Sequence, residues 1–239
     1  MKRICYILML VSSFQCFSQA TEEPVLVRFD IGKGFFAERV FAVNGSPYLN
    51  EKYEMGVIIN GPSKKEFRMR YNAYLGMFEV LDKNNKEASV LKSANILVAF
   101  DEKIYRILDY EETVQDKALY YLPQNGDKTI RGNIKEGYFN KLSDGETKLY
   151  LKTIKRIPKF KSSDHGYNRF EPTALLTLTH YFIKRKYRPA TRIKLSKKEV
   201  LFALNDKYNE LRTYIKKNKL KLKTEEEVIQ LISYYDTLN

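Results

Sequence analysis

The sequence predicts an α+β fold, mostly β, in which a curved antiparallel β-meander is followed by three short C-terminal helices. Three observations lead to this prediction. Short segments alternate apolar with polar residues up to about Ile157, turn-forming residues separate them at fairly regular intervals, and helix-capping patterns follow Pro189. No segment with helical periodicity interrupts the strands, which disfavours a parallel βαβ arrangement.

The predicted strands begin at Val25. Segment 67–71 alternates apolar with basic residues, so we expect one face to pack and the other to meet water. In segment 148–152, Leu149 and Leu151 alternate with two lysines and a tyrosine, and we expect the same division of faces. The remaining strand candidates are Val25–Phe29, Val40–Val43, Val57–Ile59, Phe78–Leu81, Ile96–Phe100, Ile104–Leu108 and Ala118–Leu122.

Turn chemistry separates these strands. Asn-Gly and Asp-Gly pairs tolerate positive φ and are the strongest short-range hairpin signals. This spacing favours a meandering antiparallel sheet, curved or partly closed. The turn segments are Asn60-Gly61-Pro62, Lys83-Asn84-Asn85-Lys86, Asn125-Gly126-Asp127 and Asp144-Gly145-Glu146.

Segment 158–195 has no single assignment. Three prolines interrupt it, and residues 162–166 are typical of a loop. Thr173–Ile183 is apolar and β-branched enough to form another strand, and a helix is the alternative. The secondary structure of this segment therefore stays open.

The C-terminal part of the chain contains helix signals. Segments 196–199 and 224–227 are capping boxes that open the first and third helices, and Asn205 or Asp206 is expected to cap the second. Apolar residues follow each cap at helical spacing. They are Val200, Leu201 and Leu204, then Tyr208, Leu211 and Ile215, then Val228, Leu231, Ile232 and Tyr235.

The first twenty residues have the pattern of a bacterial secretion signal. Lys2 and Arg3 precede the apolar run Ile4–Val11, and Ser18 and Ala20 occupy the −3 and −1 positions of a cleavage site after Ala20. The run is far shorter than the roughly 20 residues of a membrane-spanning helix, so we expect no transmembrane span in the mature chain. The alternative is a buried first element of a cytoplasmic protein. We expect export to the periplasm, the outer-membrane periphery or the extracellular space.

The only two cysteines, Cys5 and Cys16, both lie in this signal. The mature chain then has no disulfide, no thiolate nucleophile and no thiolate metal ligand. Acylation of Cys16 is a rival to simple cleavage, although Ser13 and Gln15 depart from the usual lipobox. We divide the chain into a signal peptide, 1–20, an antiparallel β-rich domain, 21–194, and a basic helical appendage, 195–239.

The positive charge of the chain is concentrated in one region. The formal net charge is +13, and segment 184–223 has fifteen Lys or Arg against three acidic residues. Such a region can contact polyanions, and export disfavours nucleic acid relative to an anionic lipid or glycan surface. The alternative is a solvated face that keeps the protein soluble. The residues expected at an anionic surface are Lys216, Lys217, Lys219 and Lys221.

Catalytic signals are few. The two histidines, His165 and His180, are too few for the common His and Cys metal sites, so we expect neither metal nor cofactor. Asp164 beside His165 is typical of a loop, and His180 lies in an apolar run typical of a core or interface residue. Paired carboxylates such as Asp101-Glu102 and Glu111-Glu112 are typical of exposed loops and strand edges.

Three stretches point to a family. They are Phe41–Asn50 with Met55–Ile58, Arg70–Tyr74 with Met77–Val80, and Tyr214–Leu220 running to Glu225–Glu227 and Tyr234-Tyr235. Together with the Phe-Ser-Gln exit of the signal, they resemble a group of uncharacterised exported β-rich proteins of the Bacteroidota. The resemblance covers most of the mature chain, and it implies no activity and no functional residue.

We therefore expect an exported, non-catalytic cell-envelope protein that binds an unidentified ligand or partner. The sheet would be its scaffold, and the basic helices would contact an anionic surface. The alternative is an exported hydrolase that uses carboxylates, with His165 as a further candidate. Several acids converging in one deep pocket would favour the hydrolase.

Overall fold

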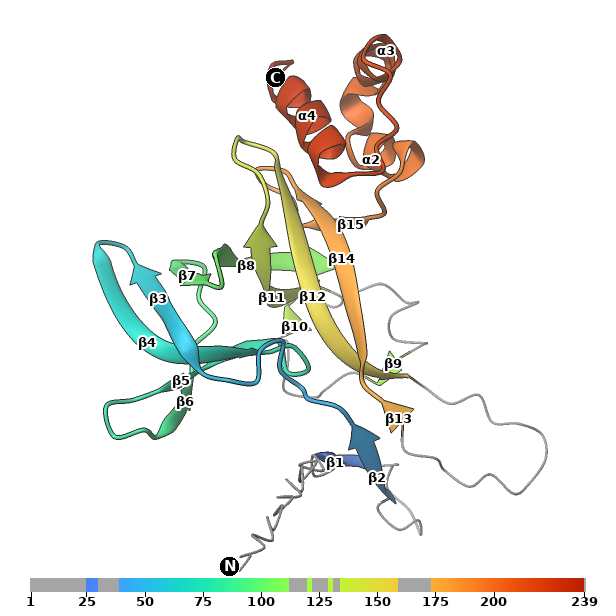
Figure 1. The fold of residues 1–239 in the computed structure, drawn as a ribbon. Helices are drawn as coiled ribbons and strands as arrows, with labels where there is room; N and C mark the ends of the chain where they lie inside the picture. Colours follow the sequence, from blue (N-terminus) through green and yellow to red (C-terminus); the bar gives the residue numbers. More distant parts are fainter. Residues whose placement is uncertain are drawn as a thin grey trace, which may run out of the picture.

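A computed structural model of the chain describes residues 25–29, 39–111, 120–121, 129–130, 134–158 and 173–238. The predicted signal peptide, with Cys16 and Ala20, and the Asp164-His165 pair lie outside these residues. The described chain is mostly antiparallel β-sheet with three helices at its C-terminal end, which confirms the predicted fold class (Figure 1).

A large sheet forms the body of the molecule. Its main path has the order β15-β14-β12-β11-β8-β7-β3-β4-β5-β6, and two short strands, β9 and β10, pair with β12 and β11. The order departs from a simple meander at one place, because β7 pairs with β3 instead of β6. The bounds are β3 Glu54–Asn60, β4 Ser63–Asn72, β5 Met77–Leu81, β6 Glu87–Ser89, β7 Ile96–Phe100, β8 Lys103–Glu111, β9 Tyr120–Tyr121, β10 Thr129–Ile130, β11 Ile134–Lys141, β12 Lys148–Pro158, β14 Leu176–Lys184 and β15 Thr191–Ile193.

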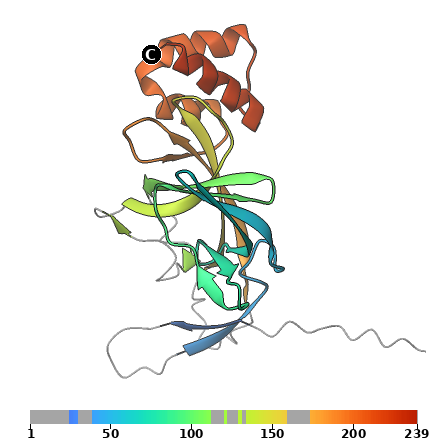
Figure 2. The ribbon, with the colours of Figure 1, turned by 90° about the vertical axis from the view of Figure 1, so that its left-hand side faces the viewer.

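A small second sheet lies at the opposite end of the molecule from the helices (Figures 1 and 2). It consists of β1 (Val25–Phe29) and β2 (Arg39–Asn44), which are antiparallel, and β13 (Thr173–Ala174), which is parallel to β2. Thr173–Ile183, which the sequence left open between strand and helix, is therefore strand, split between β13 and β14. Of the candidate Ala118–Leu122, only β9 is described.

Three of the four predicted turns connect paired strands, and the fourth, Asn125-Gly126-Asp127, lies outside the described residues. Gly61 has a φ of +57° in the connection between β3 and β4, Asn85 has a φ of 58° between β5 and β6, and Gly145 has a φ of +108° between β11 and β12. The β7–β8 turn was not predicted. There, Asp101 and Glu102 adopt left-handed φ values of 53° and 57°, a conformation in which short polar residues are several-fold enriched.

Strands β4, β5, β7, β8 and β11 carry an aromatic core. Phe78 is fully buried at its centre, and its ring centroid lies 4.8 to 5.8 Å from those of Tyr71, Phe100, Tyr105 and Tyr138. The division of faces predicted for segment 67–71 is confirmed, because Met69 and Tyr71 are buried whereas Arg68 is exposed.

Strands β8, β11, β12, β14 and β15 curl around a second core. The curl is tied at one point by Ala190, whose N–H donates to the carbonyl of Asp109 at 2.7 Å and which forms an isolated bridge with Tyr110 of β8. The sheet path itself stays open. The buried side chains of this curled core are Tyr110, Phe139, Tyr150, Phe182 and Ala190.

The division of faces predicted for segment 148–152 is wrong. Tyr150 is 1% exposed and Lys152 is 3% exposed, both on the face that carries the curled core, whereas Leu151 is half-buried on the other face. The curl is the physical reason, because a strand in a nearly closed sheet is covered on its concave face. On the other face of β12, Leu149 is covered by the helices, because it packs in their hydrophobic core.

Three helices and one 3₁₀ turn follow the sheet. The N-caps of both predicted capping boxes are confirmed, since Ser196 and Thr224 accept hydrogen bonds from the N–H groups of Glu199 and Glu227 at 3.4 Å. The Glu227 carboxylate accepts the N–H groups of Lys221 and Lys223. The cap predicted for the second helix is wrong: the 3₁₀ turn precedes that helix, and Asp206 binds side chains instead of capping it. The bounds are α2 Lys197–Ala203, η1 Asn205–Lys207, α3 Tyr208–Lys217 and α4 Glu225–Asp236.

The helices pack on one end of the curled strands (Figures 1 and 2). Their shared core joins Leu149, Ile183 and Ile193 of the sheet to apolar helix residues that include Leu211 and Leu231. A polar contact adds to it, because the Asp236 carboxylate accepts the N–H groups of residues 146 and 147 at 3.0 to 3.1 Å. The β11–β12 loop is thereby held against the last helix.

Candidate anion-binding site

A hollow of about 450 Å³ opens beside this helix-bearing end of the curled sheet. Three cationic side chains enter it from three strands, Arg106 from β8, Lys148 from β12 and Lys184 from the end of β14. Two more, Arg185 and Lys186, come from the turn that follows β14. We call this site, defined by its five cations, the basic hollow. Its remaining lining includes Leu108, Gly145, Glu146 and Tyr150.

Strand register brings the cations together. Lys148 and Lys184 are paired residues on neighbouring antiparallel strands, so their side chains leave the sheet on the same face. Arg106 pairs with Phe139 of β11, a member of the curled core, and therefore lies on that same concave side. Like charges directly opposite each other on paired strands destabilise a sheet. An anion placed between them would remove that repulsion.

The cations differ in the partners they already have. Arg185 forms an ion pair with Asp206, and Lys186 lies 3.4 Å from Glu146, with both of these side chains more than half exposed. The Lys184 ammonium donates to the carbonyl of Arg188. Among the described residues, neither Arg106 nor Lys148 has an ion pair with a carboxylate. Of the described residues that line the basic hollow, Glu146 alone is acidic, so positive charge is in excess among them.

Burial affects the ionisation of two side chains in this lining. Burial lowers the pKa of Lys184, an effect that the charge of Asp109 partly opposes. Burial raises the pKa of the Tyr150 phenol, and the charge of Arg106 works in the opposite direction. The hollow thus contains a partly desolvated ammonium group on which the Asp109 carboxylate acts, and a bound anion would further favour its charged form.

This arrangement suits the binding of a phosphate or carboxylate group. A guanidinium offers a planar fork of donors, and ammonium groups add point charges with three donors each. A hydrolase would need a nucleophile or a paired acid and base, and the one lining carboxylate, Glu146, is exposed and lies near Lys186. Within the described ranges, no group of three or more His, Cys, Asp or Glu side chains is placed to hold a metal ion.

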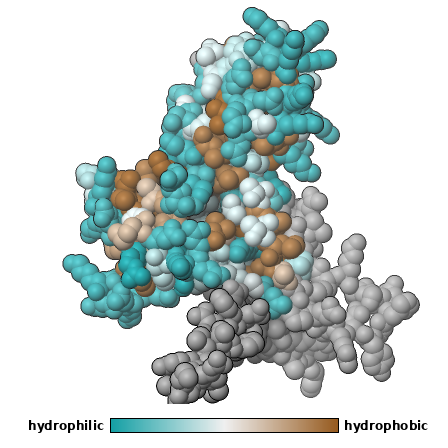
Figure 3. Space-filling view, viewed as in Figure 1, coloured by the Kyte–Doolittle hydropathy of each residue, from teal (hydrophilic) through white to brown (hydrophobic). Residues whose placement is uncertain are grey.

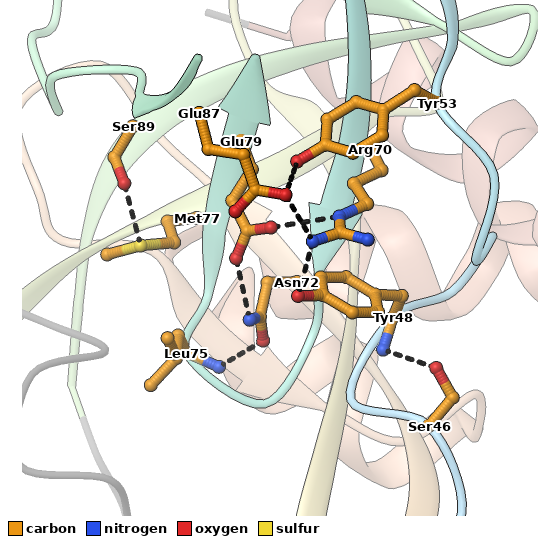
Figure 4. A network of polar contacts seen from close by, with 10 residues as sticks. All are labelled: Ser46, Tyr48, Tyr53, Arg70, Asn72, Leu75, Met77, Glu79, Glu87 and Ser89. Carbon is orange, nitrogen blue, oxygen red and sulfur yellow. Dashed lines mark hydrogen bonds and ion pairs between the residues drawn. The ribbon is translucent and has the colours of Figure 1, made fainter. Parts of the chain in front are cut away.

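A second polar network surrounds Arg70 on β4 (Figure 4). Its guanidinium is stacked on the rings of Tyr48 and Tyr53, with Cζ 3.7 and 4.4 Å from their centroids. Arg70 Nε donates to Glu79 at 2.9 Å, and Nη2 donates to the Tyr48 hydroxyl at 2.7 Å and to Glu87 at 3.2 Å. Two carboxylates therefore converge on one arginine.

These two carboxylates are already bound by neighbouring side chains. Glu79 uses one oxygen for Arg70 and the other for the Asn72 amide, which lies at 3.0 Å, and Glu87 accepts the Tyr53 hydroxyl at 2.8 Å (Figure 4). Both bonds to Glu87 are on the same oxygen, Oε1, and this side chain is 59% exposed, so its carboxylate is largely in contact with solvent and not enclosed in a site. The network instead holds residues 46–53 against β4, β5 and β6, which is a structural role.

A third cationic group, Lys152, is buried inside the curled core. Its ammonium lies 3.8 Å from the ring centroid of Tyr110 and 5.1 Å from that of Phe139. Gly137 makes room for it, since a Cβ at this position would lie 2.5 Å from Lys152 Nζ. The ammonium is therefore enclosed by aromatic faces and a glycine.

The residues predicted from sequence for an anionic contact lie elsewhere. Lys216 and Lys217 end α3, and Lys219 and Lys221 follow in the link to α4; all four are exposed, on a helical unit whose outer surface is largely hydrophilic (Figure 3). None of them lines the basic hollow. Their role stays a prediction. His180 is half-buried, with Nδ1 at 2.9 Å from Arg192, in keeping with a core or interface residue.

Sequence reasoning missed the residues of the basic hollow. Lys184, Arg185 and Lys186 fall within the charge-rich segment 184–223, but Arg106 and Lys148 come from strands more than thirty residues upstream of it. The one available signal was a lysine on an alternating strand, and that pattern is typical of a solvated face. Only strand register places Lys148 opposite Lys184.

Comparison of the chain with family models, with curated proteins and with solved structures found no match. The resemblance noted in the sequence therefore stays an expectation. In the part of the chain that the structure describes, the helices are too short and too polar for any of them to cross a bilayer.

Proposed function

We propose that this chain is an exported, non-catalytic cell-envelope protein that binds an anionic group of its ligand or partner in the basic hollow. The observation that carries the proposal is the pairing of Lys148 with Lys184 beside Arg106, in a lining with a single carboxylate. Export is supported by the N-terminal pattern alone. The periplasm, the outer-membrane periphery and the extracellular space all fit the proposal.

The packing of the site favours binding over chemistry. The rings beneath the cations belong to a closely packed core in which Phe139 and Phe182 lie 4.8 Å apart between centroids, in an edge-to-face arrangement. A rigid base of this kind fixes the positions of the cations before a ligand arrives, and such preorganisation strengthens binding. The acid that a hydrolase would require is not supplied by the described lining of the hollow.

Calorimetric titration of the full chain with glycerol phosphate and with pyrophosphate tests this function. We expect binding that weakens with salt, and a loss of about tenfold or more in affinity for Lys148→Glu and for Arg106→Gln. Lys64→Glu, an equal charge change at an exposed position on β4, serves as the matched control and should bind as the parent does. Equal binding by the parent and Lys148→Glu would show that the hollow is not the site.

A further inference from the structure

Two aromatic side chains protrude beside the basic hollow. Tyr187, in the turn between β14 and β15, is 87% exposed, and Phe202 of α2 is 74% exposed. Seven large apolar side chains of the described residues are exposed, and Tyr187 and Phe202 are the two most exposed aromatic ones among them. Lys186 lies near the first of them, with Nζ 5.7 Å from the Tyr187 ring centroid.

A second, smaller hollow places Phe202 beside one of the cations of the basic hollow. It has a volume of about 230 Å³, and Phe202 lines it together with Arg185, Arg188 and Pro189. Arg185 lines both hollows. Arg185 thus joins the basic hollow to the hollow that Phe202 lines, and Lys186 joins it to the turn that carries Tyr187, so these residues share one region of the surface. We call this surface the turn face, defined by residues 184–189 and Phe202.

We infer that the turn face docks on an anionic membrane surface, with a lipid phosphate in the basic hollow and Tyr187 and Phe202 among the headgroups. The inference rests on the proposed function and names its ligand class. Aromatic side chains flanked by lysine and arginine suit the interface between water and lipid, where the rings enter the apolar boundary and the cations meet anionic headgroups.

The exposed rings favour a lipid surface over a soluble anion or a polyanionic chain. A free phosphate would need the cations of the basic hollow and would gain nothing from Phe202. The binding of a polyanion such as a glycan or nucleic acid would be determined by positive charge, so its affinity would depend on the whole of segment 184–223. Only a partner with an apolar layer beneath its charges uses both features of the turn face.

The turn face is distinct from the four terminal lysines. Phe202 and Arg185 are close to the start of α3, whereas Lys216 and Lys217 are at its other end, and an α-helix rises about 1.5 Å per residue. The two surfaces can therefore be changed independently. If the helices make the contact, the four lysines should account for most of the vesicle binding. If the turn face makes it, Tyr187, Phe202 and the basic hollow should account for most of it.

Vesicle sedimentation with the full chain tests the inference. The vesicles are pure phosphatidylcholine or an equimolar mixture with phosphatidylglycerol, and glycerol phosphate is titrated in parallel. The variants are Tyr187→Ser with Phe202→Ser, Lys148→Glu with Arg106→Gln, and a fourfold Lys→Glu change at residues 216, 217, 219 and 221. Met55→Ser, at a side chain 60% exposed on β3, is the matched control for loss of an exposed apolar group. Every variant keeps the apolar N-terminal segment, so its contribution is equal throughout.

We expect the chain to sediment with the anionic vesicles only. The aromatic variant should bind them about tenfold more weakly while its affinity for glycerol phosphate is unchanged. The variant with Lys148→Glu and Arg106→Gln should lose the binding of both vesicles and glycerol phosphate. Met55→Ser should retain both.

Three results would overturn the inference. If the chain binds glycerol phosphate through Lys148 but the aromatic variant binds vesicles like the parent, lipid docking is wrong and the proposed function stands. If the chain binds neither glycerol phosphate nor vesicles, both fail. If only the fourfold lysine variant loses vesicle binding, the contact is made by the terminal helices and not by the turn face.

Discussion

Lys148 and Lys184 lie directly opposite each other on the antiparallel strands β12 and β14. Folding brings two ammonium groups to one face, above the buried rings of Tyr150 and Phe182, which form the next pair along on that face. A sheet gains nothing from this pairing, because like charges directly opposite are unfavourable. The proposed binding of an anion gives this pairing a functional explanation, because a negative charge between the two ammonium groups would make it favourable.

The first prediction concerns this pair. Lys148→Glu replaces a repulsive pair with an attractive one, and we expect the free energy of unfolding to rise by about 0.2–1 kcal/mol. The same change should weaken binding of glycerol phosphate by about tenfold or more. Urea denaturation and calorimetric titration of the same preparation measure the two effects. A variant that is destabilised would show that Lys148 has a structural role, in contradiction to this account.

Much of the fold follows from local sequence patterns. Segment 67–71 and the capping boxes at Ser196 and Thr224 were predicted because each depends on residues close together in the chain. Strand β11 was not predicted, because Ile134–Lys141 contains Gly137 and several polar residues and has no clear alternation. Its glycine is explained by Lys152 on the next strand, a contact that no local pattern contains.

The candidate site could be predicted only in part. The charge of segment 184–223 marked one side of the basic hollow, but the other side depends on the register of β12 with β14 and on the curl of the sheet. A shift of register by one residue would move Lys148 to the opposite face. Alternation within one strand cannot indicate which face is concave, so the face of β12 that carries Lys148 and Lys152 was assigned to solvent.

The second prediction concerns the join between helices and sheet. Asp236→Ala removes the acceptor of two backbone N–H groups in the β11–β12 loop, and we expect a loss of about 1.5 to 3 kcal/mol in the free energy of unfolding. Asp144→Ala, on the same loop, is the control, because the aspartate of its pair with Lys141 is exposed, and it should change stability much less than Asp236→Ala does. Equal effects of the two changes would argue against a specific tether.

The third prediction concerns the glycine beside the buried lysine. Gly137→Ala would place a methyl group 2.5 Å from Lys152 Nζ and 3.2 Å from the Tyr110 ring, in a packed interior, so we expect a loss of about 1–3 kcal/mol. In a Lys152→Met background the nearest atom is gone, and the cost of the alanine should fall by about 1 kcal/mol. Denaturation of the four proteins in this cycle measures the coupling, and additive effects would contradict the contact.

The fourth prediction concerns the stacked arginine. Arg70→Lys keeps the charge but loses the planar stack on Tyr48 and Tyr53 and the separate bonds to Glu79 and Glu87, so we expect a loss of about 1–3 kcal/mol. The matched control is Arg68→Lys, at an exposed arginine on the same face of the same strand, which should stay within about 0.5 kcal/mol of the parent. Similar values for the two variants would mean that the network does not hold residues 46–53.

The last prediction concerns acid stability at the start of α3. Burial tends to raise the pKa of Asp206, but hydrogen bonds from the Tyr235 hydroxyl and Arg185 outweigh it, so the pKa lies below its usual value of 3.8. A carboxyl whose folded pKa is depressed contributes stability above its unfolded pKa and loses it as the pH falls through the folded value. The parent should therefore lose more stability between about pH 5 and pH 3 than Asp206→Asn does. Urea denaturation at the two pH values measures this difference, with Glu210→Gln, at an exposed acid in the first turn of α3, as the control. A parent and an Asp206→Asn variant with equal acid sensitivity would mean that this carboxylate makes no specific contribution to folding.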